Sequence, residues 1–265
     1  MRIMLCFIVS KVNILIGSGK MKNIKMIIEY DGSRYLGWQR LGDSDKTIQG
    51  KLESVISEMV GSPTEVIGSG RTDAGTHARG QVANFKTNVN MNSSEMHKYI
   101  NHYLPQDIVV KEIEEVNDRF HSRYNVKGKK YIYYVWNHWI PSPFDRKYSY
   151  YYAEKLDIEL MNKAARALIG THDFIGFSSV KKTNKSTTRT IENISIVQEG
   201  NMLKFIFIGE GFLYNMIRII MGTLLEIGSG QKDTSYIDQI FEGKSRSIAG
   251  ITVPAQGLFL EEVYY

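Results

Sequence analysis

The chain has 265 residues, of which 43% are hydrophobic and 23% charged, and its formal net charge is +5. This is the composition of a globular protein with one large or two smaller domains, and it excludes a fibrous or wholly disordered chain. The basic balance favours a polyanionic partner. A single cysteine, Cys6, excludes an internal disulfide, no Cys/His cluster has zinc spacing, and both facts suit a reducing cytoplasm.

Residues 1–20 are apolar and basic and superficially resemble a signal peptide. Lys11 interrupts the apolar run early, and no cleavage site of small residues follows. The run is also too short to span a bilayer. We therefore expect an N-terminal extension that is dispensable, so that a chain beginning at Met21 folds and acts like the longer one.

The first half is expected to alternate strands and helices. Helical spacing of apolar residues predicts a helix over Thr47–Val60 that ends at Gly61, and a second over Ser94–Tyr103. The expected strands are Ile24–Tyr30, Val66–Ser69, Gln81–Thr87 and Ile108–Val116.

The second half repeats this mixture. Gly200-Asn201 between two apolar runs predicts a hairpin of Ile191–Glu199 with Met202–Ile208. Further strands are expected at Lys129–Trp136 and Leu258–Val263, and helices at Asp157–Ile169, Leu213–Ile227 and Tyr236–Phe241. The pattern indicates an α+β protein of two halves, 21–126 and 127–265, with the basic run Lys127–Lys130 at their junction.

The run GSGRTDAGTHARGQV, Gly68–Val82, is the most informative part of the sequence. Its glycines let the backbone take positive φ and let a large ligand come close. Asp73 follows Arg71 by two positions, and a guanidinium beside a carboxylate lowers the pKa of that acid and keeps it ionised. Such a loop suits an aspartate that acts as nucleophile or base. The alternative is a charged turn with a surface ion pair.

Several blocks of the sequence resemble the tRNA pseudouridine synthase A (TruA) family. Gly70–Val82 is similar to the family signature GRTDAGxHAxGQV. Other similar blocks follow in the family's order: IEYDGSRYLGWQR at Ile28–Arg40, FHSRY at Phe120–Tyr124, KKYIYYVWN at Lys129–Asn137, HDFIGF at His172–Phe177, RTI at Arg189–Ile191, GFLYNMIRIIMGTLLEIGSG at Gly211–Gly230 and GLFLEEV at Gly257–Val263. The resemblance covers roughly residues 24 to 265, so residues 1–20 are a non-family extension.

The resemblance implies a fold and a reaction. The family has two similar α/β halves whose antiparallel sheets join across a basic RNA-binding cleft. Its members convert uridine to pseudouridine at positions 38, 39 and 40 of the tRNA anticodon stem-loop, without cofactor or metal, and work as homodimers. The chemistry breaks the bond from ribose C1′ to uracil N1 and rejoins the base through C5, which needs a group that attacks C1′ or C6.

The family motifs place functional roles on four residues of this chain. Asp73 is the implied nucleophile. Arg71 pairs with it or fills the space left when the target uridine leaves the stack. Tyr131 lies against the uracil and helps to move the C5 proton. Arg218, on an otherwise apolar helix, needs a buried carboxylate partner, which the family points to as Asp73.

Basic residues near the junction are candidate RNA contacts: His121, Arg123, Lys127, Lys129 and Lys130. For these the alternative is a solvated basic face. His77, four residues after Asp73, is expected to make a structural hydrogen bond rather than bind metal. Two other functions stay open, an RNA-binding protein that has lost catalysis and an unrelated hydrolase that uses Asp73 with His77. The intact Arg71, Asp73, Tyr131 and Arg218 argue against the former, and the lack of a metal or second acid against the latter.

Overall fold

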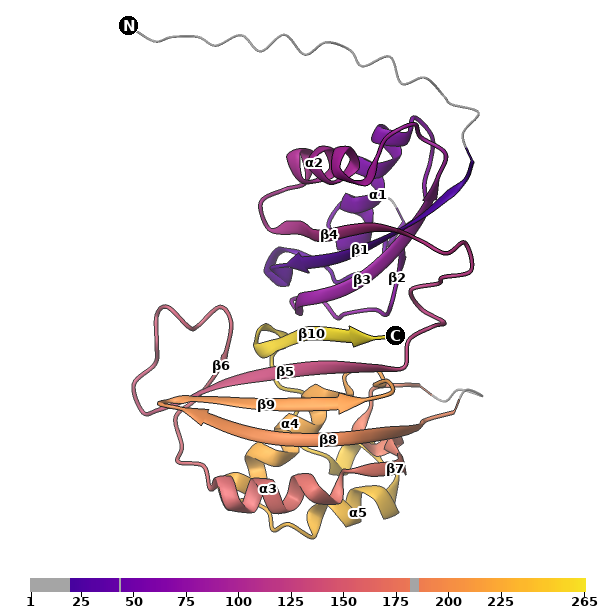
Figure 1. Ribbon diagram of the computed structural model, residues 1–265. Helices are drawn as coiled ribbons and strands as arrows, with labels where there is room; N and C mark the ends of the chain where they lie inside the picture. Colours follow the sequence, from indigo (N-terminus) through magenta and orange to yellow (C-terminus); the bar gives the residue numbers. More distant parts are fainter. Residues whose placement is uncertain (1–19, 43, 182–185) are drawn as a thin grey trace, which may run out of the picture.

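The computed structural model describes residues 20–42, 44–181 and 186–265, which form a mixed α+β protein (Figure 1). The strands are β1 (Lys22–Tyr30), β2 (Ile67–Gly68), β3 (His77–Thr87), β4 (Ile108–Val116), β5 (Gly128–Asn137), β6 (Tyr150–Tyr152), β7 (Gly170–Asp173), β8 (Thr188–Glu199), β9 (Met202–Gly209) and β10 (Leu258–Tyr264). The helices are α1 (Ile48–Val60), α2 (Ser93–Tyr103), α3 (Ile158–Ala167), α4 (Met216–Gly228) and α5 (Tyr236–Gly243). The expected extension, residues 1–20, lies outside the described residues except for its last member.

The strands form one continuous sheet in the order β4-β1-β3-β10-β5-β9-β8-β7, with β2 beside β3 and β6 beside β5. Neighbours on this path run antiparallel except β10 and β3, and β6 is also parallel to β5. The sequence predicted antiparallel sheets that join, and the structure shows one large mixed sheet whose junction between β10 and β3 is parallel. The cause is β10, which follows the helices of the second half and lies between the halves, pairing Phe259 with His77 and Leu260 with Ala78.

Local sequence signals explain the helix that supports the first half. The Thr47 hydroxyl accepts the Gly50 N–H at 3.2 Å and caps the first turn of α1. Gly61 ends the helix with φ at 77°, the left-handed conformation that favours glycine. Between them Leu52 and Ile56 are fully buried against the sheet core, so the helix is held by its apolar face.

The predicted bounds agree with the structure where periodicity is strong and depart from it at turns. β4 has the predicted bounds, and α1 differs only at its capping residue. α4 begins at Met216 rather than Leu213, because Asn215 takes φ of 60° and interrupts the helical path. The short strands β6 and β7 were not predicted, since three or four residues carry too little pattern.

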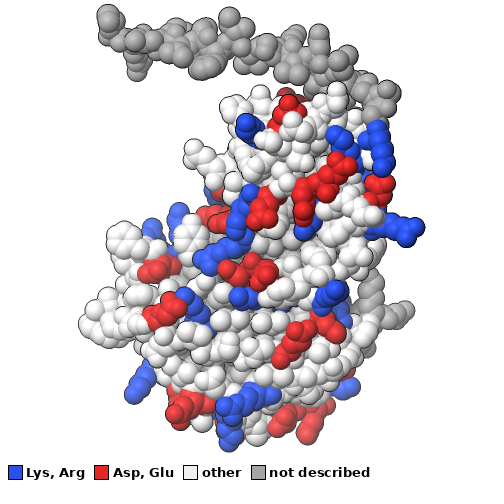
Figure 2. Space-filling view, viewed as in Figure 1, with Lys and Arg blue, Asp and Glu red and all other residues white. Residues whose placement is uncertain are grey.

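The helices leave one face of the sheet uncovered. In Figure 1 α1 and α4 lie behind the strands, and on the face toward the viewer no described helix lies over β3, β10 or β5. Along β5, Tyr133 and Val135 are fully buried, whereas Tyr134 and Trp136 alternate onto the other face. Figure 2 shows this face, on which acidic and basic side chains are interspersed in small groups.

Candidate active site

Asp73 lies in the loop between β2 and β3, on the wall of a cleft of about 900 Å³. Both halves contribute to this cleft. The first half supplies residues of the Asp73 loop and of the segment that precedes α1, and the second half supplies Tyr131 of β5 and the residues that lead into α4. A ligand in the cleft would therefore contact both halves of the sheet.

The Asp73 loop rests on the segment between β1 and α1, backbone against backbone. The Trp38 N–H donates to the Thr72 carbonyl at 3.1 Å, and the Gly75 N–H donates to the Tyr35 carbonyl at 3.3 Å. A Cβ atom on Gly37 would come within 2.5 Å of the Thr72 carbonyl oxygen, and this glycine has φ of +99°. Only glycine fits there, so the two motifs of the first half build one support for the acid.

Asp73 pairs with Arg218 across the cleft. The Nη1 atom of Arg218 lies 3.4 Å from Oδ2 of Asp73, and the two side chains are 17% and 24% exposed, respectively. Burial raises the pKa of Asp73 above its ordinary value, and the Arg218 charge and hydrogen bond offset part of that rise. The expectation that Arg218 finds its carboxylate partner in Asp73 is confirmed.

The prediction that Arg71 lowers the pKa of Asp73 is wrong. Arg71 is exposed and lines the cleft, and within the described residues it makes no hydrogen bond or ion pair with Asp73. The intervening Thr72 is buried, with its hydroxyl 2.8 Å from the Tyr30 hydroxyl, so the chain alternates and directs Arg71 to solvent. Of the two roles expected of Arg71, the pairing with Asp73 is not seen among the described residues.

Arg218 is held by more than the acid. Its Nε atom donates to the Val253 carbonyl at 2.8 Å, and Nη1 donates to Oδ1 of Asn215 at 2.9 Å. These neutral acceptors compensate much of the cost of removing a guanidinium from water. The guanidinium is therefore placed at the cleft wall by α4 and by the segment that precedes β10.

Tyr131 projects from β5 into the same cleft and is buried. Its ring meets Phe212 edge to face, with centroids 5.3 Å apart. Burial raises its pKa, and the charge of Asp73 raises it further, so the phenol is neutral at physiological pH. Tyr131 and Asp73 line one cavity, as the family motif implies.

Lys129 is the best placed of the predicted RNA contacts. Its ammonium donates to the Ser69 carbonyl at 3.1 Å, lies against Gly70 and lines the cleft. Within the described ranges no carboxylate lies at ion-pair distance from it. Burial and the charge of Arg123 lower the pKa of Lys129 to about 8.

The other predicted basic contacts are placed differently. Arg123 lines the cleft, whereas His121, Lys127 and Lys130 do not. The Nδ1 atom of His121 accepts the backbone N–H of Arg123 at 3.2 Å, and its ring stacks on the exposed Tyr124. The structure thus brings two of the five candidates to the acid's cleft.

His77 has the structural role expected of it. Its Nδ1 accepts the Gly32 N–H at 3.1 Å, and its ring stacks on Phe259 at 4.6 Å. Burial lowers its pKa, so the ring is neutral near pH 7.

Among the described residues no three His, Cys, Asp or Glu side chains come together as metal ligands. No described helix has the length and apolarity needed to cross a membrane.

The structure adds residues to the cleft to which the sequence analysis gave no role. Arg189 comes from β8, within the RTI block, and Asn215 precedes α4. Three large apolar side chains of the cleft are about half exposed: Leu36 (51%), Leu41 (51%) and Tyr214 (58%). For Arg189, Asn215, Leu36 and Tyr214 the only sequence signal is their place inside the family blocks, and Leu41 follows such a block directly.

Comparison with known proteins agrees with this geometry. The family model described as tRNA pseudouridine synthase matches residues 26–125 and 164–265. A tRNA pseudouridine synthase A 2 of Bacillus cereus (strain ATCC 10987 / NRS 248) is 49% identical over 245 residues, which cover 92% of this chain and all of the relative. The tRNA pseudouridine synthase A proteins of Bacillus sp. (strain KSM-64) and Acetivibrio thermocellus are 51% and 46% identical over the same shares.

The matched model defines the class of the protein, a tRNA pseudouridine synthase, which is an isomerase. Within that class the identities place it plainly: the chain belongs to the tRNA pseudouridine synthase A family.

Proposed function

We propose that this protein isomerises uridine to pseudouridine at positions 38, 39 and 40 of the tRNA anticodon stem-loop, in the cytoplasm, with Asp73 as nucleophile. The observation that carries the proposal is the Asp73–Arg218 pair, which is partly desolvated in a cleft that both halves build. An acid whose ionisation is set by burial and one cation is typical of a catalytic group. The family resemblance supplies the three tRNA positions.

The proposed reaction conserves all atoms of the nucleotide. The Asp73 carboxylate attacks C1′ of the ribose or C6 of the uracil, the bond from C1′ to N1 breaks, and the base turns. A bond from C1′ to C5 then forms, the C5 proton moves to N1, and Asp73 leaves as a carboxylate. Arg218 keeps the acid ionised before the attack. Tyr131 lies against the base. It is a neutral phenol when the substrate binds, and in this form it takes part in moving the C5 proton.

The target nucleotide must leave its stack to reach Asp73, at a cost of a few kcal/mol. Arg71 is exposed at the edge of the cleft and free of the acid. A planar cation there suits the second of its expected roles, filling the space left in the RNA. Leu36, Leu41 and Tyr214, half exposed around the acid, offer apolar surface to unpaired bases beside the target.

Charge favours this cleft as the RNA site. Its lining holds five cationic side chains and two acids: Arg71, Arg123, Lys129, Arg189 and Arg218, with Asp73 and Glu210. The cavity on the uncovered face holds more acids than cations: Glu29, Asp31, Asp107 and Asp145, with Arg79 and Lys204. Since phosphate contacts dominate RNA affinity, the first cavity suits RNA and the second does not.

Incubation with unmodified tRNA tests the proposal directly. Pseudouridine mapped at positions 38, 39 and 40, and lost with Asp73→Asn, is the expected result. Tight binding without any pseudouridine would indicate instead an RNA-binding protein that has lost catalysis. Cleaved RNA would indicate a hydrolase.

Lys129 predicts a pH dependence of RNA binding. Its ammonium faces the cleft without an acidic partner among the described residues, and its pKa is about 8. The charged form exists below that value, so tRNA affinity should fall as pH rises through 8. Lys129→Met should remove this dependence and reduce the log–log salt slope of binding by about 1. Lys155→Met, an exposed lysine near α3, is the control. An unchanged pH and salt dependence in Lys129→Met would place the phosphate elsewhere.

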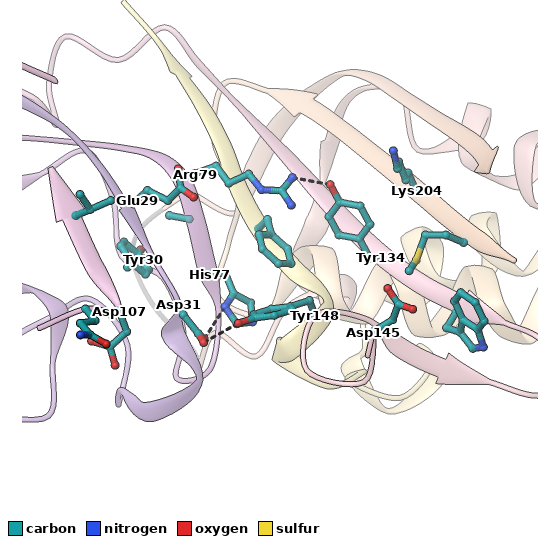
Figure 3. Close-up of a pocket in the computed structure, with 16 residues that line it drawn as sticks. Glu29, Tyr30, Asp31, His77, Arg79, Asp107, Tyr134, Asp145, Tyr148 and Lys204 are labelled. Atoms are coloured by element: carbon teal, nitrogen blue, oxygen red, sulfur yellow. Dashed lines mark hydrogen bonds and ion pairs between the residues drawn. The ribbon is translucent and has the colours of Figure 1, made fainter. Parts of the chain in front are cut away.

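The homodimer expected from the family has a suitable surface on the uncovered face. A cavity of about 660 Å³ lies there over β3, β10 and β5. Figure 3 shows Arg79 directed at the Tyr134 hydroxyl, and both His77 and Tyr148 in contact with Asp31. The loop between β5 and β6 protrudes beside it (Figure 1) and leaves Trp139 and Phe144 73% and 92% exposed. Such apolar exposure is typical of a protein interface.

We expect this loop to contact the second copy. Phe144→Glu or Trp139→Glu should convert a dimer to a monomer at micromolar concentration, because a charge would be buried at the interface. Light scattering coupled to size-exclusion chromatography measures the mass. Leu160→Glu on the exposed side of α3 is a matched control that should leave the mass unchanged. Dimers that persist in both loop variants would exclude this surface.

A further inference from the structure

The residue that precedes α4 has an uncommon backbone conformation. Asn215 takes φ of 60° and ψ of 6°, in the left-handed region. Only two residues other than glycine have positive φ within the described parts of the chain, and Lys244 is the other. This conformation costs a residue with a side chain free energy, and asparagine is one of the few residues other than glycine that adopt it. Strain of this kind at an active site is a reason to ask what it maintains.

The side chain of Asn215 does not cap its own helix. An asparagine at this position usually accepts a backbone N–H of the first turn, and here no such bond exists. Instead Oδ1 accepts from Nη1 of Arg218 at 2.9 Å, and Nδ2 donates to the Ser179 hydroxyl at 3.1 Å. The two bonds fix which way the amide faces, so its oxygen points at the guanidinium.

The Asn215 bond is the shorter of the two that Nη1 makes. The same nitrogen lies 3.4 Å from Asp73, against 2.9 Å from Asn215. Nε is held separately by the Val253 carbonyl at 2.8 Å. The position of the guanidinium therefore depends on two neutral acceptors as well as on the acid, and it should persist when the acid loses its charge by bonding to the substrate.

We propose that Asn215 is a positioning residue, which holds the Arg218 guanidinium at a fixed distance from Asp73. The left-handed turn at Asn215 directs its amide toward the side chain of Arg218, three residues further along the chain. Residues at this spacing are neighbours on a helix surface. The inference rests on the proposed function in that Asp73 is taken as the nucleophile. It assigns to Asn215 no contact with RNA.

Loss of the amide should change the ionisation of Asp73. In Asn215→Gly the backbone keeps its positive φ, and the guanidinium loses one of its two neutral acceptors. The guanidinium is then less firmly held near Asp73 and lowers the pKa of that acid less. The pKa of Asp73 should therefore rise further, by about 1 unit. The charged and titratable groups around Asp73 are Arg218 of α4, Tyr131 and Lys129 of β5, Tyr30 of β1, Arg189 of β8, and Arg71, Arg123 and Glu210 from loops.

The test measures the Asp73 carboxyl directly in the RNA-free protein, by NMR titration of ¹³C-labelled aspartate, with Asp73→Asn to assign the signal. We expect the Asp73 midpoint to rise in Asn215→Gly and to stay unchanged in Lys244→Gly, which removes the other strained residue. The Asn215→Gly change should add nothing in an Arg218→Met background, because the residue acts through Arg218.

Three titration results would overturn the proposal. They are an unchanged midpoint in Asn215→Gly, the same rise in Lys244→Gly, or a rise that persists in the Arg218→Met background. Because the titration needs no substrate, a failure to form pseudouridine would contradict the proposed function and leave this measurement valid. Single-turnover rates of Asn215→Gly should show the same upward displacement of the acid limb. A uniform loss of rate at every pH would indicate a merely structural role.

Discussion

Asp73→Asn is expected to abolish pseudouridine formation, with a loss on the order of 10⁴-fold or more, as when a catalytic nucleophile is removed. The amide has the shape of the carboxylate but cannot attack carbon. Folding should survive, because Arg218 keeps the Val253 carbonyl and the Asn215 amide as acceptors. Binding of tRNA should survive as well, since the substitution leaves every cation of the cleft in place.

Single-turnover formation of pseudouridine measures this effect, with tRNA affinity and thermal unfolding recorded on the same samples. Asp118→Asn is a suitable control, because Asp118 is exposed and lies away from the cleft. Substantial turnover by Asp73→Asn would remove the acid from the mechanism. Loss of folding would leave the nucleophile to be tested by Asp73→Glu, which keeps the charge but displaces it.

Arg218→Met is expected to cause the second largest loss, and the loss should depend on pH. Burial already raises the pKa of Asp73, and Arg218 is the group that opposes this. Without the cation that pKa should rise by about 1–3 units. Activity requires the ionised acid and falls as pH drops through the pKa. The variant should therefore lose most activity near pH 7 and regain part of it at higher pH.

The pH–rate profile of single turnovers separates this role from a steric one. The acid limb of Arg218→Met should lie at higher pH than that of the wild type. Arg218→Lys should also be impaired, because a point charge cannot bond to Val253, Asn215 and Asp73 with the geometry of a planar fork. Profiles of identical shape in wild type and Arg218→Met would show that Arg218 does not set the ionisation of the acid.

Local sequence patterns predicted most of the helices and strands. They did not predict which strands pair with one another in the sheet. Helix α1 could be predicted because Thr47 marks its start, Gly61 marks its end, and an apolar stripe runs between them. The position of β10 in the sheet could not be predicted, because the sequence of a strand does not indicate which strands it will pair with. Its partner β3 lies far earlier in the chain. The start of α4 was missed since Met216 follows a left-handed asparagine that sequence periodicity does not register.

The same distinction applies to the site. The glycines around Asp73 and the family motif predicted a catalytic role for that acid, which stays a prediction. The need of Arg218 for a carboxylate predicted the ion pair that the structure shows. The pKa shift was predicted with the wrong sign, because nearness in sequence to Arg71 was given more weight than burial. Burial depends on how both halves close over the loop, and only the three-dimensional structure contains that information.

The position of β10 has a consequence for synthesis of the protein. Asp73 belongs to the first half and Arg218 to the second, and Leu258–Tyr264 is the strand that joins their sheets. A ribosome releases these residues after every other described element. Until then β3 and β5 each have an edge that is only partly paired, by the short strands β2 and β6, and unpaired edges invite aggregation. We therefore expect Asp73 and Arg218 to meet only after β10 is made, so that a prematurely terminated chain would lack the pair to which we assign catalysis.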